Sequence, residues 1–145
     1  MKRDGAKHMG RFAVEFEVVN RADVNLAQRG YIAAEAVRRV RLQGVVDTGA
    51  TRLVLPLKVV LQLGLEATGK VSVRSADGRR AIRSTVEDVQ VELMGRRGVF
   101  TASIEPKRKT ALIGAIVLED LDFLSDTTHQ RLVPRDPKMI VSEAE

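Results

Sequence analysis

Apolar positions recur at intervals that predict a series of short strands. Residues 11–19 read RFAVEFEVV, in which every second position is apolar, as in a half-buried strand. Residues 20–29 are polar and irregular, and Gln28-Arg29-Gly30 favours a turn. Residues 37–46 alternate and then become wholly apolar at Val45-Val46, which indicates a strand that runs from an exposed edge into a core. Residues 51–55 predict a further short strand.

The second half of the chain repeats this organisation with turns between its strands. Pro56 fits the first turn of a helix over residues 57–63, which Gly64 can end in the left-handed conformation. Strands are predicted over residues 70–74, 81–93 and 99–104, with a primed turn at Asp77-Gly78, a turn over residues 95–98 and a basic loop over residues 106–109. Residues 116–121 suit one or two helical turns, and residues 121–124 can pair with 131–133 in a last hairpin. Many short strands and two short helices predict an all-β barrel or sandwich.

Length and composition set the domain organisation. The chain has 145 residues, enough for one domain with its own core. We expect that domain over residues 11–138, followed by a C-terminal tail over residues 139–145. Residues 1–10 are polar and basic, and are interpreted as an N-terminal arm or a segment left by cloning. Cysteine is absent, which excludes disulfides and thiolate chemistry, and no apolar run reaches the ~18 residues needed to cross a bilayer. A cytoplasmic protein without a membrane partner is expected.

The net charge of +5 introduces nucleic acid as a possible partner. The basic residues fall in short clusters, most of them at predicted turns or loops. Solvated surface is the favoured interpretation of such clusters. Aromatic residues make up only 3% of the chain, so that no stacking platform for single strands is present. The composition therefore does not favour a nucleic-acid partner.

One motif carries candidate chemistry, and it follows the apolar strand directly. Asp47-Thr48-Gly49-Ala50 places a carboxylate at the end of that strand and a glycine two residues later. A carboxylate delivered beside a core is costly unless it is paired, hydrogen-bonded or protonated. Glycine permits a tight turn or a close backbone approach. An ordinary turn is the simpler alternative, since Asp in such a sequence can bond its own backbone.

A second segment has a related pattern. Gly114-Ala115 follows the apolar residues 111–113 and precedes a short helix, as Gly49-Ala50 precedes residues 57–63. When the two glycines are superimposed, Leu112 takes the place of Asp47. The second segment therefore keeps the turn and lacks the acid.

These features resemble the retroviral-type aspartic proteases, or retropepsins, and most closely their small cellular forms. The resemblance covers about residues 40–133 and implies a closed or partly closed acid-protease barrel with one or two short helices. It implies that Asp47 is the catalytic carboxylate, with loop support from Thr48, Gly49 and Ala50. It further implies a structural strand and turn at Leu112, Ile113 and Gly114, and a substrate-covering flap with its tip at Ser75, Ala76, Asp77 and Gly78.

Peptide hydrolysis by carboxylates needs two of them around one water. Because Leu112 cannot act as an acid, the second carboxylate has to come from another copy of the chain, which predicts a homodimer. The predicted function is an aspartic endopeptidase that cleaves polypeptides without a cofactor or metal. The alternatives are a peptide-binding module of the same fold with little turnover, and a basic nucleic-acid-associated domain.

One further cluster is a candidate metal site. Hard cations bind carboxylates, and a group of acidic residues with one histidine lies near the C-terminus. A solvated helix end and hairpin is the favoured interpretation of this group, which consists of Glu119, Asp120, Asp122, Asp126 and His129.

Overall fold

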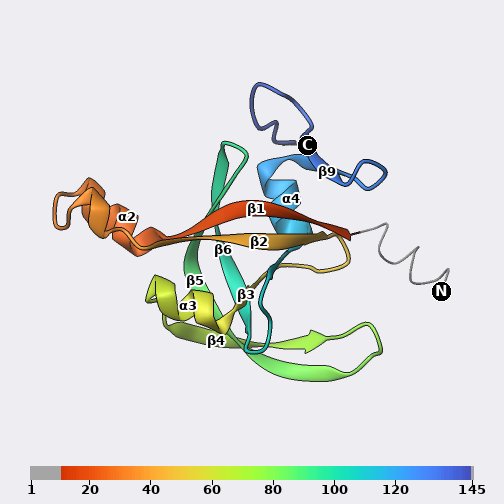
Figure 1. Ribbon diagram of the computed structural model, residues 1–145, viewed down its shortest axis with the longest axis horizontal. Coiled ribbons are helices and arrows are strands. Elements are labelled where there is room, and N and C mark those ends of the chain that lie inside the picture. The colour runs from red at the N-terminus through yellow and green to blue at the C-terminus, as the bar shows by residue number, and fades with distance from the viewer. Residues whose placement is uncertain (1–10, 145) are drawn as a thin grey trace.

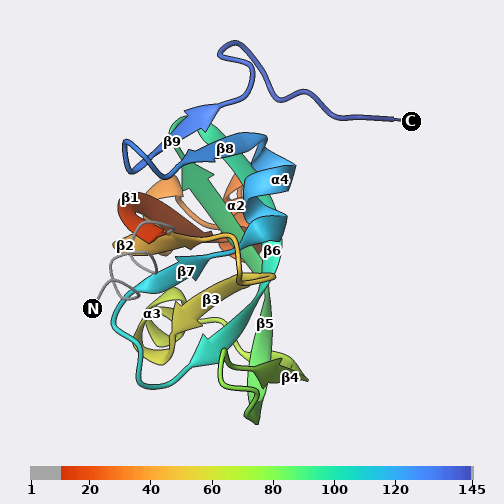
Figure 2. The same ribbon diagram turned by 90° about the vertical axis from the view of Figure 1, so that its right-hand side faces the viewer.

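The strands form a closed barrel in the computed structural model, which describes residues 11–144. Six strands follow one another in the order β1-β2-β7-β3-β6-β5, and pairing of β1 with β5 closes the ring. β4 pairs with β5 outside the ring. The two views show the β4–β5 ribbon projecting from one end of the barrel and the β8–β9 hairpin at the other (Figures 1 and 2). The expected all-β barrel is confirmed.

The strands are β1 (Arg11–Asn20), β2 (Arg39–Asp47), β3 (Leu53–Pro56), β4 (Ala67–Arg74), β5 (Arg80–Leu93), β6 (Arg96–Glu105), β7 (Ala111–Ile113), β8 (Phe123–Asp126) and β9 (Arg131–Pro134). The helices are α2 (Arg21–Gln28), α3 (Leu57–Leu63), α4 (Ala115–Leu121) and the 3-10 helix η1 (Ala34–Ala36). The predicted arm over residues 1–10 lies outside the described residues, and the domain boundary at 138 stays a prediction.

Aliphatic side chains fill the barrel, because aromatic residues are scarce. Alternating positions of the strands point inward, and the helices α3 and α4 each bury one face against them. The fully buried side chains include Phe16, Val18, Val46, Leu53, Leu55, Leu63, Val86, Val89, Val91, Leu93, Ile113 and Leu121.

The segment after β1 is helical, and the prediction of an irregular segment over residues 20–29 was wrong. Asn20 begins α2 by accepting a hydrogen bond from the Asp23 backbone N–H at 3.0 Å, and its side-chain amide donates to the Leu63 carbonyl at 2.8 Å. Asp23 accepts bonds from the backbone, Nε and Nη2 of Arg38 at 2.8–3.0 Å. α2 buries only Asp23, so it lacks the apolar stripe by which a helix is recognised. The described residues thus hold three α-helices where one or two were expected.

Two hairpin turns differ in detail from the prediction. Residues 75–79 connect β4 to β5, and Gly78 has a φ of 87°, but Asp77 does not share the positive φ that a primed turn needs. The β5–β6 turn is formed by Met94 and Gly95, with φ values of 49° and 82°. This turn begins one residue before the predicted turn over residues 95–98 and ends at Gly95, because Arg96 already pairs with Leu93 as the first residue of β6.

The helix α3, the helix α4 and the last hairpin largely follow the sequence pattern. Pro56 precedes α3 and does not enter its first turn, while Gly64 ends α3 with a φ of 69°, as expected. The last hairpin forms, and its junction with α4 is held by Asp122, which accepts bonds from Arg135 Nε at 2.7 Å and from the Val141 backbone at 2.9 Å. Arg96 caps α4 by donating to the Leu121 and Asp122 carbonyls.

Gly114 joins β7 to α4 and packs directly on the loop that follows β2. β2 and β7 run parallel, with Val46 opposite Ile113. A Cβ atom at Gly114 would lie 2.5 Å from the Arg52 carbonyl and 2.8 Å from the Ala50 carbonyl. Gly114 has an extended backbone, so contact with the loop, and not a positive φ, is what demands glycine. The backbone N–H groups of Ala115 and Ile116 donate to the Ala50 and Thr51 carbonyls at 2.8 and 2.9 Å.

The Asp23–Arg38 pair predicts a pH-dependent contribution to stability. Hydrogen bonds from Arg38 hold the pKa of Asp23 below its ordinary value. The ionised form therefore stabilises the fold above the ordinary carboxyl range, and this contribution is lost as the pH falls through the lowered pKa. We expect Asp23→Asn to reduce the free energy of unfolding by about 1–3 kcal/mol at pH 7, and the difference from wild type to shrink toward pH 3. Urea unfolding at both pH values measures this, and a pH-independent difference would contradict it.

The contact at Gly114 predicts a steric effect of one methyl group. Gly114→Ala should lower the free energy of unfolding by about 1–3 kcal/mol, because backbone atoms of the facing loop must shift. Gly69→Ala is the matched control, since its Cβ would meet only the Thr85 hydroxyl, at 3.0 Å. Urea denaturation compares the two variants. Equal losses in both would show that Gly114 is not specifically required.

Candidate active site

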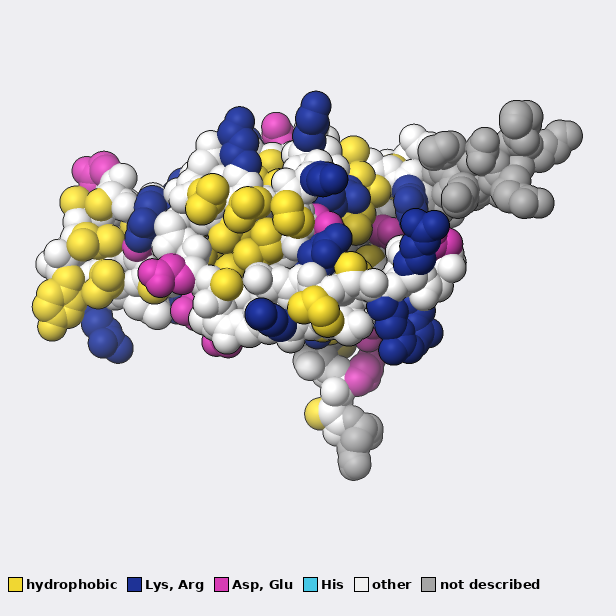
Figure 3. Space-filling model, turned by 90° about the horizontal axis from the view of Figure 1, so that it is seen from below, with side chains coloured by type: hydrophobic (Ala, Val, Ile, Leu, Met, Phe, Trp, Pro, Cys, Tyr) yellow, Lys and Arg dark blue, Asp and Glu magenta, His cyan; other side chains and the backbone are white. Residues whose placement is uncertain are grey.

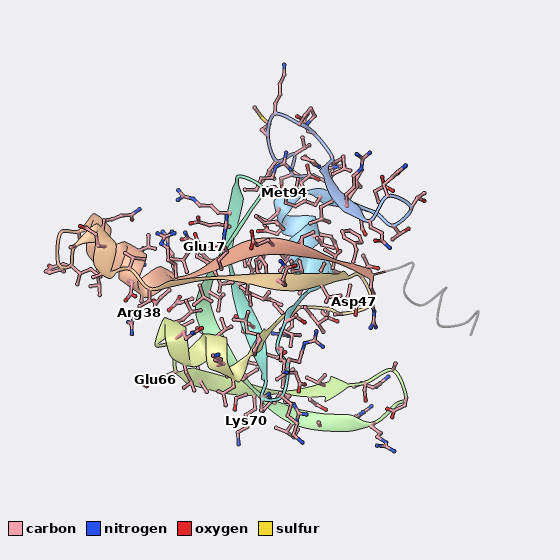
Figure 4. The ribbon with its side chains drawn as sticks, viewed as in Figure 1. Glu17, Arg38, Asp47, Glu66, Lys70 and Met94 are labelled. Carbon is pink, nitrogen blue, oxygen red and sulfur yellow. The ribbon has the colours of Figure 1, made fainter. Side chains whose placement is uncertain are left out.

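Asp47 is the last residue of β2, and its side chain is only 13% exposed. Its Oδ1 accepts the Gly49 backbone N–H at 3.0 Å. Its Oδ2 lies 3.2 Å from Nη2 of Arg11, the first residue of β1, which stands directly opposite Asp47 in the antiparallel register. Asp47 ends β2, and Arg38, which directly precedes β2, lies at the opposite end of that strand (Figure 4). The motif therefore presents a carboxylate with a partner on each oxygen.

The three residues after Asp47 form a tight loop. The Ala50 backbone N–H donates to the Asp47 carbonyl at 3.1 Å, which closes the turn. Thr48 and Gly49 are exposed at its tip. A Cβ atom at Gly49 would lie 3.2 Å from Asp47 Oδ1, so glycine allows this backbone to approach the carboxylate. The ordinary-turn alternative describes the loop locally, but it does not account for the support that the loop receives from β7 and α4.

Residues 112–114 lie beside β2 and the loop that follows it, and their predicted role as support for the catalytic loop stays a prediction. Leu112 pairs with Val45 and Ile113 with Val46, so that β7 extends the sheet beside the strand that carries Asp47. Ile113 is fully buried, and Gly114 contacts the loop itself. The position that matches Asp47 in the second segment is a leucine, and it supplies no acid. Of these two matched positions, only Asp47 therefore carries a carboxylate.

The predicted flap is the ribbon of β4 and β5, and its tip is a self-contained loop. Ser75 donates its backbone N–H to the Arg79 carbonyl at 2.8 Å. Asp77 Oδ1 accepts the Arg79 backbone N–H at 3.0 Å and the Ser75 hydroxyl at 2.9 Å, and these two bonds hold the pKa of Asp77 below its ordinary value. Every residue of the tip, including Ala76 and Gly78, is exposed. Substrate covering by this tip stays a prediction.

Two members of the acidic cluster near the C-terminus, Asp122 and Asp126, have basic partners. Asp122 pairs with Arg135, and Asp126 lies 2.9 Å from His129 Nδ1 and 3.3 Å from Arg131 Nε. Within residues 11–144, no three His, Cys, Asp or Glu side chains are grouped closely enough to hold a metal ion. These contacts fix the β8–β9 hairpin and the tail that follows it.

Two features were not predicted from the sequence. The first is the contact of Arg11 with Asp47, which depends on the register between β1 and β2. The second is an open depression of about 670 Å³ outside the barrel, whose lining includes Glu15, Glu17, Glu92 and Met94. Neither could be read from residue spacing, because both arise from the pairing of separate strands. Glu17 and Met94 are remote from Asp47 in Figure 4.

Comparisons with protein families and with solved structures each found a similar protein. A family model described as gag-polyprotein putative aspartyl protease matches residues 34–120, which is more than half of the chain. Among solved structures, the retroviral protease-like domain of Ddi1 from Leishmania major is 15% identical, with a TM-score of 0.49 over 86% of this chain and 90% of that one. No curated protein matches the sequence. No helix within residues 11–144 is long and apolar enough to cross a membrane. The chain belongs to the gag-polyprotein putative aspartyl protease family, and the retropepsin-like assignment made from its Asp-Thr-Gly motif is confirmed.

Proposed function

We propose that the protein is an aspartic endopeptidase that acts as a homodimer in the cytoplasm and hydrolyses polypeptides. One observation carries the proposal: Asp47 ends a barrel strand, and its Oδ1 accepts a hydrogen bond from the Gly49 N–H. The loop that contains Gly49 packs directly against Gly114. This geometry orients a carboxylate without burying it completely. It is the arrangement that a group needs in order to exchange a proton with a bound water.

The chemistry requires two carboxylates facing one water. One accepts a proton from the water as it attacks the scissile carbonyl, and the other, protonated, donates to the carbonyl oxygen. Two adjacent carboxylates share one proton, because like charges at short distance resist simultaneous ionisation. The pair titrates as a unit, so neither proton belongs to one residue. No metal or cofactor enters this reaction.

A homodimer supplies the second carboxylate. A two-fold axis beside the loop would place one Asp47 from each chain on either side of a shared water. Thr48 and Gly49 are exposed at the tip of this loop, where a second copy can reach them. We assign the Thr48 hydroxyl to hydrogen bonds across the axis. The flap ribbon would close over the bound peptide and exclude water.

The proposal predicts that Asp47 is essential for cleavage. Asp47→Asn should reduce kcat/KM on a mixed peptide library by about 10²- to 10⁴-fold or more, since an amide cannot act as a base. Asp88→Asn is the matched control, because Asp88 is exposed in β5, and Asn tolerates its φ of 63°. Mass spectrometry of the digested library measures both variants. Cleavage retained by Asp47→Asn would exclude the mechanism.

The same proposal predicts a concentration-dependent specific activity. If each site needs two chains, activity per chain should rise with enzyme concentration below the dimer dissociation constant and become constant above it. Serial dilution of wild type with one fluorogenic peptide, beside sedimentation velocity at the same concentrations, tests this. Activity per chain that is constant across a range where only single chains sediment would rule out a shared site.

A second candidate is a peptide-binding module of the same fold with little or no turnover. The flap tip supports it, since Asp77 is committed to its own loop and all tip residues are exposed and polar or small. Apolar side chains gather on the face seen in Figure 3, with Lys and Arg side chains around them. On α3, the side chains of Leu57 and Leu61 are exposed and available for contact with a peptide. Peptide binding that is equal in wild type and Asp47→Asn, without cleavage by either, would favour this candidate.

A further inference from the structure

The Arg11 guanidinium occupies the oxygen of Asp47 that its own loop leaves free. Gly49 holds Oδ1, and Arg11 Nη2 lies 3.2 Å from Oδ2. The contact is set by the fold, because Arg11 and Asp47 are direct partners in the β1–β2 register. The Arg11 side chain is 51% exposed, whereas that of Asp47 is 13% exposed. Arg11 is therefore the more solvent-exposed member of the pair.

This contact opposes the arrangement that the proposed reaction needs. A guanidinium keeps its proton under all ordinary conditions, so it cannot donate one to a substrate. With Arg11 Nη2 3.2 Å away, Oδ2 already has a charged partner, and this is an oxygen that a water or a second carboxylate has to approach in the proposed reaction.

We propose that Arg11 is an autoinhibitory latch, which holds Asp47 in the single chain and must release it when two chains bring their Asp47 residues together. The inference rests on the proposed function, since it assigns Arg11 a role in assembling that site. The latch is weak enough to open, because an ion pair with a solvent-exposed partner changes the equilibrium between its paired and open states by a factor of about 1.4 to 5. Association of two chains opens two latches, so the latch couples activity to dimer formation.

Arg41 provides a matched control on the neighbouring strand. It lies 3.6 Å from Glu15, its side chain is 63% exposed, and it forms the same kind of pair across β1 and β2. Arg41 stands six positions before Asp47 in β2, and its ion pair is with Glu15 and not with the loop after Asp47. Arg11→Met and Arg41→Met therefore remove the same charge and keep a similar apolar stem.

The test is the dimer dissociation constant, measured by sedimentation velocity for wild type, Arg11→Met, Arg41→Met, Asp47→Asn and the Arg11→Met/Asp47→Asn double variant. We expect Arg11→Met to lower the constant by about twofold to thirtyfold, the square of the factor for one exposed pair. Arg41→Met should leave it within about twofold of wild type. In the Asp47→Asn background, Arg11→Met should have no larger effect than Arg41→Met, because the partner of the latch is gone.

The outcomes separate the latch from the proposed function. Tighter association of Arg11→Met without peptide cleavage by any variant would support the latch and remove the peptidase. Cleavage by wild type with an unchanged or weaker Arg11→Met dimer would overturn the latch and leave the peptidase standing. An Arg11→Met effect that persists in the Asp47→Asn background would also overturn it, since Arg11 would then act elsewhere. Failure of every variant to associate would overturn both the latch and the shared site.

Discussion

The candidate site depends on a backbone contact that tolerates no side chain. Gly114 lies so close to the Ala50 and Arg52 carbonyls that the loop after Asp47 and the start of α4 form one packed unit. Two backbone hydrogen bonds from the first turn of α4 hold the loop from behind. Loops are ordinarily the variable parts of a barrel, and a reactive group on a free loop is poorly placed. Here the parallel pairing of β2 with β7 brings the supporting turn to the loop, so that Asp47 is positioned by the core.

Local pattern predicted the strands well and the segment between β1 and β2 poorly. Strict alternation in residues 11–19 and the apolar end of residues 37–46 record burial inside the barrel, which is why both strands could be read directly. α2 buries a single aspartate, and its stability comes from capping by Asn20 and from the distant Arg38, which no periodicity reveals. The β5–β6 turn was predicted too far along the chain, because the two glycines that flank Arg96-Arg97 resemble a turn. The residues with left-handed backbone are Met94 and Gly95.

The same distinction applies to the site. Asp47 and Gly114 were identifiable because each follows an apolar strand and each begins a short-range feature, a turn or a helix. The Arg11–Asp47 contact was not identifiable, because it depends on a register fixed across an intervening helix and 3-10 turn. A slip of one residue would have turned Arg11 to the opposite face of the sheet. Long-range pairing, and not residue type, decides which charge faces the carboxylate.

These observations place a thermodynamic condition on any dimer built around Asp47. In the single chain the carboxylate is already satisfied, since one oxygen accepts a backbone N–H and the other faces a guanidinium. The Asp47 carboxylate of one chain therefore has partners without any contribution from a second chain. Bringing two such carboxylates together removes two ion pairs and adds a repulsion that only a shared proton relieves. The contacts elsewhere in the interface must supply that free energy, so the strength of the interface, more than the acid itself, would determine when the site becomes active.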